Sequence, residues 1–204
     1  MKNIEILESK KIIDYKFAVS YMEEKLLDVK NNTAKELIWF LEHPSIYTSG
    51  RGNPVNQNYI NKIPIYNSDR GGKITWHGPG QRIIYFIIDL KKRGLDIRRF
   101  VSNIEKFIIE SLLELDIKAY KKNNIVGIWT LDKEKKEAKI GSLGLRVSKG
   151  IIYHGLSLNV SCDLSNFYKI DPCGIKNSAP VVNICKSRPD LKPVTVFTWS
   201  VDNV

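Results

Sequence analysis

Two stretches of the 204-residue chain carry residue types suited to chemistry. The first, DRGGKITWHGPGQ at 69–81, combines an arginine, four glycines and a histidine directly before a strand-forming run. It lacks the glycine spacing of phosphate-binding loops, and a strand follows instead of a helix. We interpret it as bare backbone against which a ligand lies, with the amides of Gly71, Gly72 and Gly78 free to donate hydrogen bonds. A tight structural crossover explains the glycines equally well, and a single histidine such as His77 is more often structural than catalytic.

The second stretch is IDPCGIKN, in which Cys173 lies between a proline and a glycine. A stiff turn of this kind suits a reactive thiol, and a neighbouring ammonium group favours the thiolate form. Lys139, in EAKIGSLGLR, is a candidate neighbour, although it ends a charged run typical of a solvated hairpin tip. A lone cysteine is more often an inert thiol, and sequence spacing does not bring Lys139 to Cys173. Cys162 and Cys185 are interpreted as ordinary small residues near strand or loop ends.

Composition limits the class of protein. With 43% hydrophobic and 26% charged residues, the chain is expected to be soluble and to form one domain over residues 1–204. No apolar stretch approaches the roughly 18 residues of a membrane helix, and the N-terminus lacks a signal peptide's apolar region. We therefore expect a cytoplasmic protein that does not bind membranes. The three cysteines fit neither a disulfide framework nor a zinc site, so no metal is expected.

The formal net charge of +10 favours an acidic or polyanionic partner, unless it reflects a bias toward lysine, isoleucine and asparagine. The basic residues are spread along the chain, without a helix-turn-helix, zinc-finger or RNP pattern, so nucleic acid is not the expected partner. An acidic protein partner would explain the net positive charge equally well. A basic nucleic-acid-binding module without catalysis remains the alternative from a different functional class, supported only by net charge.

Hydrophobic periodicity predicts the elements that must position these residues. Helices are expected over 14–30 and over 96–115, the second behind an aspartate cap. Strands are expected over 36–43, 63–68, 82–90, 125–131, 139–147 and 150–160, with a surface loop over 50–62. The last two strands form a predicted hairpin, and the strand at 82–90 should be buried on both faces because its apolar run does not alternate. This order predicts a mixed α/β or α+β domain with helices packed on a largely antiparallel sheet.

Four motifs, RGGKITWHGPGQ at 70–81, AKIGSLGLR at 138–146, HGLSLNV at 154–160 and DPCGI at 171–175, together resemble the lipoyl(octanoyl) transferase family. Four motifs in one order and spacing are far more specific than any one of them. The resemblance implies the fold of biotin and lipoate protein ligases. It also implies an octanoyl-[acyl-carrier-protein]:protein N-octanoyltransferase, in which the 70–81 segment lines the acyl-binding cleft.

The resemblance assigns roles by motif position. It implies that Cys173 is the nucleophile and Lys139 its dyad partner. The implied substrate-binding residues are Arg70, Gly71, Gly72, Lys73, Ile74, Thr75, Trp76, His77, Ser142, Leu143, Gly144, Gly155, Leu156 and Ser157. Two positions differ from the commonest family form. Trp76 replaces a frequent tyrosine and keeps an aromatic wall, whereas Asp171 replaces a frequent asparagine and places a carboxylate close to the thiol, which disfavours the thiolate.

The implied reaction moves an octanoyl group from acyl carrier protein, through a thioester on Cys173, to the ε-amine of a lysine. The implied acceptors are lipoyl domains of 2-oxoacid dehydrogenase complexes and the glycine cleavage H protein, and the step is the first of endogenous lipoate biosynthesis. No cofactor and no ATP are expected, because the thioester is already activated and its phosphopantetheine belongs to the donor. Lys139 would accept the proton of the incoming amine. An ATP-dependent lipoate-protein ligase, which forms an acyl-adenylate, is the alternative within the same fold.

Overall fold

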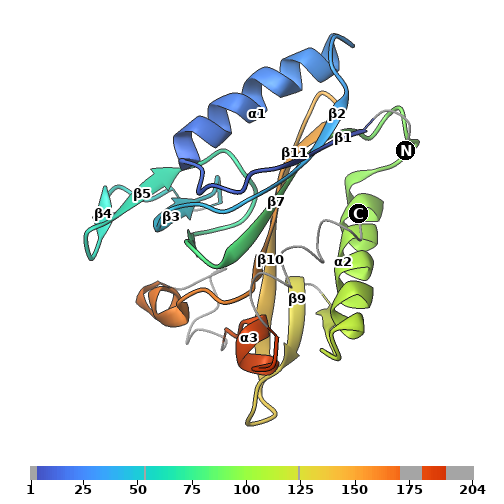
Figure 1. Cartoon of the computed structure of the whole chain (residues 1–204). Coiled ribbons are helices and arrows are strands. Elements are labelled where there is room, and N and C mark those ends of the chain that lie inside the picture. Colours follow the sequence, from blue (N-terminus) through green and yellow to red (C-terminus); the bar gives the residue numbers. More distant parts are fainter. Residues whose placement is uncertain (1–3, 53, 124, 171–180, 192–204) are drawn as a thin grey trace.

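The computed structural model describes residues 4–52, 54–123, 125–170 and 181–191 (Figure 1). Its larger sheet has seven strands in the order β1-β2-β7-β11-β10-β9-β8. These strands are β1 (Ile4–Glu8), β2 (Glu36–Leu41), β7 (Gln81–Asp89), β8 (Tyr120–Lys122), β9 (Ile125–Leu131), β10 (Glu137–Ser148) and β11 (Ile151–Asn159). Strands β1 and β2 are parallel, and the other neighbouring pairs in this described sheet are antiparallel. The prediction of a largely antiparallel sheet is confirmed.

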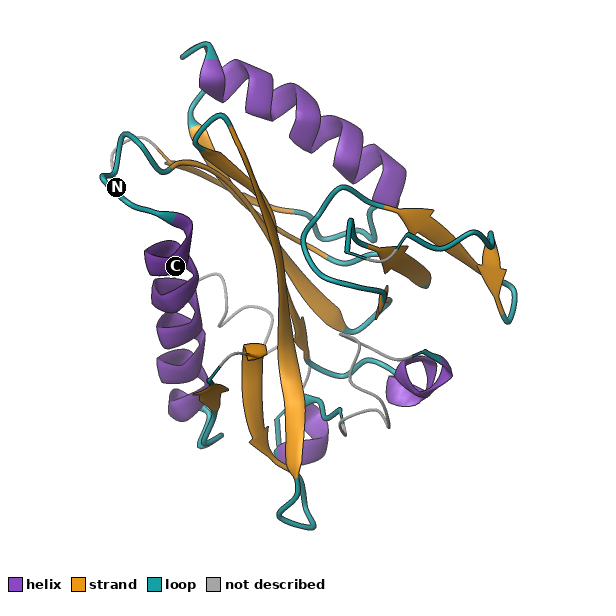
Figure 2. Ribbon diagram, turned by 180° about the vertical axis from the view of Figure 1, so that it is seen from behind, coloured by secondary structure: helices purple, strands orange, loops and turns teal. Residues whose placement is uncertain are grey.

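Strand β7 separates two layers of core. Helix α1 (Tyr15–Lys30) covers one face of the sheet and helix α2 (Ile97–Glu114) the other, as Figure 2 shows from behind. Ile83, Tyr85 and Ile87 belong to the layer under α1, and Ile84, Phe86 and Ile88 belong to the layer under α2. Alternate residues of a strand point to opposite faces, so a continuous apolar run supplies both layers. The predicted burial of this strand on both faces is confirmed.

Both long helices begin where the sequence predicts. Asp14 accepts a hydrogen bond from the amide of Phe17 at 3.0 Å, and Asp96 accepts one from the amide of Arg99 at 2.8 Å. Such caps satisfy amides of the first turn that have no partner within the helix. No helix in the described part of the chain is long and apolar enough to cross a membrane.

A second sheet holds the glycine-rich segment in place. Its four strands have the order β4-β5-β3-β6. Their bounds are β3 (Ile46–Ser49), β4 (Tyr59–Ile60), β5 (Ile63–Asn67) and β6 (Thr75–His77). Tyr47 and Trp76 of this sheet pack with Phe167 of the short 3₁₀ helix η1 (Leu164–Lys169) in a third apolar cluster. Another short helix, α3 (Ile184–Ser187), follows. The chain therefore enters the 68–74 loop from β5 and leaves it into β6.

The structure differs from the sequence predictions mainly in its short strands. The predicted surface loop at 50–62 contains β4, which forms a tight hairpin with β5, and the glycine-rich stretch contains β6, which pairs with the distant strand β3. The strand predicted over 36–43 ends at Leu41. The predicted hairpin is confirmed as β10 and β11. Lys149 and Gly150 both have positive φ angles, 52° and 95°, as a two-residue hairpin turn requires.

Candidate active site

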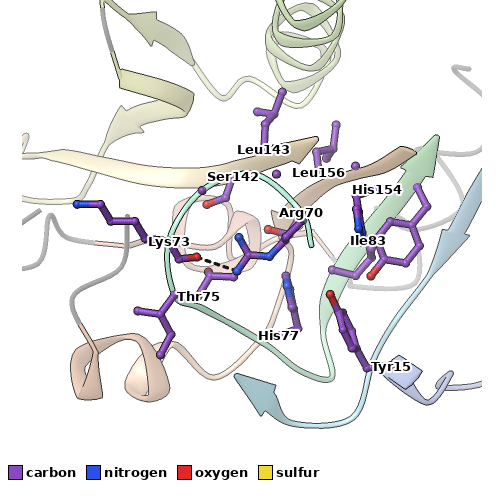
Figure 3. Close-up of a pocket in the computed structure, with 16 residues that line it drawn as sticks. Tyr15, Arg70, Lys73, Thr75, His77, Ile83, Ser142, Leu143, His154 and Leu156 are labelled. Atoms are coloured by element: carbon purple, nitrogen blue, oxygen red, sulfur yellow. Dashed lines mark hydrogen bonds between the residues drawn. The ribbon is translucent and has the colours of Figure 1, made fainter. Parts of the chain in front are cut away.

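A cavity lies between the 70–77 segment and the β10–β11 hairpin (Figure 3). The segment contributes Arg70, Gly72, Lys73, Ile74, Thr75 and His77; the hairpin contributes Ser142, Leu143, Gly144, His154, Gly155, Leu156 and Ser157; and Tyr15, Ile83 and Tyr85 complete the lining. The lining thus combines aliphatic residues and glycine backbone with nine residues whose side chains carry polar groups. This combination suits an apolar ligand with one polar end.

Arg70 organises the loop on one side of this cavity. Its Nη2 atom donates to the carbonyl oxygens of Thr48 at 2.6 Å and Lys73 at 2.8 Å, and its Nη1 atom donates to the carbonyl of Gly71 at 2.8 Å. Nε and Nη2 also reach Oγ1 of Thr48, at 3.1 and 2.8 Å. A guanidinium group is suited to this task because it presents five donors in one rigid plane. Arg70 was predicted to bind substrate; it lines the cavity while these donors hold the protein's own loop.

Asp69 ties the same loop to the hairpin. Its Oδ1 atom accepts from Nε2 of His154 at 2.6 Å, and its Oδ2 atom accepts from the hydroxyl of Tyr153 at 2.5 Å. Arg146 forms an ion pair with the same carboxylate. The hydrogen bond from His154 is the largest cause that holds the pKa of Asp69 below its ordinary value, helped by Tyr153 and Arg146. The loop wall is therefore anchored by an ionised carboxylate.

The glycines allow backbone segments to approach each other closely. A Cβ atom on Gly155 would lie 1.7 Å from the carbonyl oxygen of Ile84, so only glycine fits between β11 and β7 here. The prediction that the Gly71 amide is free was wrong, because this amide donates to the carbonyl of Leu145 at 3.2 Å. The glycines of the 70–77 segment thus have two placements: Gly72 lines the cavity, and Gly71 lies where the backbone passes close to the hairpin.

The two histidines beneath the cavity are buried and neutral. His77 hydrogen-bonds Gln81 Oε1 through Nδ1 at 2.7 Å, and His43 contacts the hydroxyl of Tyr85 through Nε2 at 2.7 Å. Burial, and then the charges of His43 and Arg70, lower the pKa of His77 to about 3, while burial lowers the pKa of His43 to about 4. Imidazole rings held this way accept or donate hydrogen bonds at neutral pH without carrying charge.

Lys139 is buried in strand β10, with 6% of its surface exposed. Its Nζ atom donates to the carbonyl of Val126 at 3.0 Å and lies 5.5 Å from the ring centroid of Trp129. The alternative that Lys139 belongs to a solvated hairpin tip was therefore wrong. The strand that carries Lys139 continues directly into Ser142, which lines the cavity.

Cys173 and Asp171 lie outside the described residues. The chain that follows them returns to Lys139: Val181 forms an isolated parallel bridge with Lys139, whose carbonyl accepts from the amide of Val182 at 3.1 Å. Cys162 is buried, and burial raises the pKa of its thiol to about 12. Cys185 also has its pKa raised by burial. Both thiols therefore remain protonated at neutral pH, consistent with the ordinary structural roles expected from the sequence.

The structure brings twelve of the predicted substrate-binding residues to one cavity: Arg70, Gly72, Lys73, Ile74, Thr75, His77, Ser142, Leu143, Gly144, Gly155, Leu156 and Ser157. Gly71 and Trp76 lie outside that lining. Trp76 packs edge to face on Phe167 and donates to Ser45 Oγ at 3.0 Å, so it supports the third apolar cluster and not the cavity wall. The ammonium group of Lys73 extends away from the other labelled side chains (Figure 3).

Sequence reasoning missed four lining residues, Tyr15, Ile83, Tyr85 and His154. His154 begins the HGLSLNV motif, and its position was the available signal. The other three come from the start of α1 and from β7, where an apolar or aromatic residue looks like any core residue. In the described part of the chain, no three histidine, cysteine, aspartate or glutamate residues gather into a possible metal site.

Comparisons with known proteins agree with the geometry. The sequence profile of the family described as "Lipoyl protein ligase A/B catalytic domain" matches residues 14–198. A curated octanoyltransferase from Zymomonas mobilis is 46% identical over 176 residues, which are 86% of this chain and 81% of the relative. One from Paramagnetospirillum magneticum is 41% identical over 165 residues, or 80% of this chain and 78% of the relative.

Solved structures show the same fold at low sequence identity. The crystal structure of LipL1 from P. falciparum in complex with lipoate aligns with a TM-score of 0.72 at 13% identity, covering 98% of this chain and 61% of that one. A bipartite lipoate protein ligase from Thermoplasma acidophilum aligns with a TM-score of 0.69 at 14% identity, covering 98% of this chain and 82% of that one. The predicted ligase-like fold is confirmed. Together, the profile and the curated relatives show that this chain belongs to the octanoyltransferases, acyltransferases that carry the lipoyl protein ligase A/B catalytic domain.

Proposed function

We propose that this octanoyltransferase moves an octanoyl group from acyl carrier protein to a lysine of a lipoyl domain in the cytoplasm, through a thioester on Cys173. The observation that carries the proposal is the arrangement of three motifs around one cavity, whose lining includes aliphatic surface suited to an eight-carbon chain. The acceptors are lipoyl domains of 2-oxoacid dehydrogenase complexes and the glycine cleavage H protein.

In the first step, the Cys173 thiolate attacks the carbonyl carbon of the donor thioester and a new carbon–sulfur bond forms. The original carbon–sulfur bond breaks, and the phosphopantetheine thiolate leaves. Lys139, which starts as an ammonium group, donates a proton to this leaving group. The step ends with an octanoyl-enzyme, a free phosphopantetheine thiol and a neutral Lys139.

In the second step, the ε-amine of the acceptor lysine attacks the octanoyl-enzyme and forms the amide bond. The carbon–sulfur bond to Cys173 breaks, and Lys139 takes the proton that the amine loses. This restores the ammonium group and the thiolate of the starting enzyme. The energy of the donor thioester drives both steps, so the proposed reaction uses neither ATP nor a cofactor of its own.

The cavity supports the binding side of this proposal. Ile74 and Ile83 supply aliphatic surface for the acyl chain. Ser142 and Ser157 lie on facing positions of the hairpin, where β10 and β11 pair. Gly144 and Gly155 contribute backbone atoms to the same lining.

The net charge of +10 fits docking of both protein partners, because acyl carrier proteins and lipoyl domains are generally acidic. Complementary charge raises the rate of encounter more than it raises the final affinity. It therefore suits an enzyme that must release one protein partner before it binds the next.

The proposed function is tested by reconstitution with purified proteins. Octanoyl-acyl carrier protein and an unmodified lipoyl domain are incubated with the enzyme without ATP, and the mass of the lipoyl domain is followed. An octanoyl amide on the target lysine supports the proposal. Modification only when free octanoate and ATP are supplied would instead identify an acyl-adenylate-forming ligase. The Cys173→Ser variant is the matched control and should leave the lipoyl domain unmodified.

A further inference from the structure

Glu105 is a buried carboxylate for which the proposed reaction has no use. It lies on helix α2 with 7% of its surface exposed, although its neighbours on that face are apolar. Its Oε1 atom accepts a hydrogen bond from the backbone amide of Gly127 in strand β9, at 3.2 Å. Buried carboxylates are uncommon, because removing a charge from water costs free energy unless the group has partners.

The amide that donates to Glu105 and the carbonyl that accepts from Lys139 belong to one peptide group. The N–H of Gly127 and the C=O of Val126 are the two ends of one peptide unit, and the Val126 oxygen accepts from Lys139 Nζ at 3.0 Å. In a trans peptide these two bonds point in opposite directions. The carboxylate therefore contacts the positive end of the peptide dipole and the ammonium group contacts its negative end. Both charges favour the same orientation of the peptide.

Gly127 is adapted to this arrangement. Its φ angle is +138°, which side chains rarely tolerate. A Cβ atom at this position would lie 2.4 Å from Cε and 2.9 Å from Nζ of Lys139. The glycine thus allows both the unusual peptide orientation and the passage of the lysine side chain directly across the backbone.

We propose that Glu105 is a positioning residue for Lys139: by fixing the orientation of the Val126–Gly127 peptide, it holds the ammonium group where the reaction needs it. The proposal rests on the proposed function, in which Lys139 exchanges protons with the reacting groups. Without an acceptor at position 105, the peptide is free to rotate about the permissive Gly127, and its carbonyl no longer defines the location of Nζ. The proton transfers then slow because their distance is no longer fixed.

The decisive test is a double-mutant cycle on the rate at which octanoyl-acyl carrier protein acylates Cys173 in a single turnover. Glu105→Met should lower this rate about 10- to 100-fold when Lys139 is present. In a Lys139→Met background the same change should have no further effect, because a residue that acts only through Lys139 has nothing left to position. Equal losses in both backgrounds would overturn the proposal and indicate a general structural role.

Two further variants sharpen the cycle. Glu105→Gln keeps an oxygen acceptor for the Gly127 amide and should restore most of the rate. Glu110→Met removes an exposed carboxylate from the same helix and should leave the rate unchanged. A Glu105→Gln variant as slow as Glu105→Met would contradict the hydrogen-bond argument.

A second measurement separates this proposal from the proposed function. The rate at which an amine-acylating reagent modifies Lys139 is measured by peptide mass spectrometry, without any substrate. Glu105→Met should raise this rate, and Glu105→Gln and Glu110→Met should not. Unchanged labelling of Lys139 in Glu105→Met would overturn the positioning role even if the enzyme forms its octanoyl thioester. If Glu105→Met raises the labelling of Lys139 but the wild-type enzyme forms no octanoyl thioester, the positioning role of Glu105 stands and the proposed function is rejected.

Discussion

Nε2 of His154 donates to Oδ1 of Asp69 at 2.6 Å, and this hydrogen bond connects the cavity loop to strand β11. The two residues are 85 positions apart in the chain. The same carboxylate accepts from Tyr153 and pairs with Arg146. The ionised carboxylate of Asp69 therefore helps to fix the relative position of loop and hairpin, together with the hydrogen bond from the Gly71 amide to the Leu145 carbonyl.

Asp69→Asn should lower the free energy of unfolding at pH 7 by about 1–2 kcal/mol, because hydrogen bonds to a charged group are lost. The partners hold the pKa of Asp69 below its ordinary value of 3.8, so its stabilisation is fully present above that pH. It is lost as the pH falls further. The free energies of unfolding of wild type and variant, measured by urea denaturation, should therefore converge as the pH falls.

The matched control for that measurement is Glu24→Gln, which removes an exposed carboxylate from α1. It should change stability little at any pH. A gap between wild type and Asp69→Asn that stays constant from neutral to acidic pH would show that the ionised form of Asp69 is not what anchors the loop.

The buried histidines predict a second, separate loss of stability in mild acid. Burial lowers the pKa of His77 to about 3 and of His43 to about 4, from an ordinary value of 6.5. Between 6.5 and these values the unfolded chain binds protons that the folded chain excludes, so stability falls as the pH decreases. Chemical denaturation between pH 7 and pH 4 measures this slope. His43→Gln should reduce it, and an unchanged slope would contradict the assignment.

Arg70→Lys should damage activity more than stability. A lysine keeps the charge but cannot direct donors at Thr48, Gly71 and Lys73 together. We expect kcat/KM to fall about 10- to 100-fold as the loop loses its fixed shape. Arg51→Lys, the same substitution at an exposed neighbouring arginine, is the control and should stay near wild type. Equal behaviour of the two variants would exclude a shaping role for Arg70.

Charge-guided docking predicts a dependence on salt. Raising the ionic strength should lower kcat/KM for octanoyl-acyl carrier protein while leaving kcat almost unchanged, because salt screens the long-range attraction that speeds encounter. A small octanoyl thioester without the acidic protein is the control substrate and should show little change. Identical salt profiles for the two donors would rule out a docking role for the net charge of +10.

Much of the fold could be predicted because its main elements are long and strongly patterned. The continuous apolar run at 83–88 predicts a strand buried on both faces, and the aspartate cap at Asp96 predicts where the second long helix begins. Strands such as β4 and β6 could not be predicted in this way. They have two and three residues, too few to show a periodic pattern: β4 closes a tight hairpin with β5, and β6 exists because β3, distant in the sequence, pairs with it.

The residues of the candidate site could likewise be predicted only where a sequence motif marks them. The motif positions predict most of the lining, but they do not reveal that Tyr15 and Tyr85 reach it from α1 and β7. Trp76 has the opposite behaviour: it lies within a motif, yet its indole packs against Phe167. The burial of Lys139 was also hidden, because the charged run before it is typical of a surface, and only tertiary contacts with Val126 and Trp129 enclose it.

The most direct test of the proposed reaction is intact-protein mass spectrometry after brief incubation with octanoyl-acyl carrier protein in the absence of ATP. The account predicts one octanoyl adduct, removed by hydroxylamine, mapped to Cys173 and absent from Cys173→Ser. Lys139→Met should form the same adduct far more slowly, because it lacks the group that donates a proton to the leaving thiolate. If the Cys173→Ser variant transferred the octanoyl group to the lipoyl domain as fast as the wild-type enzyme does, the account would be contradicted.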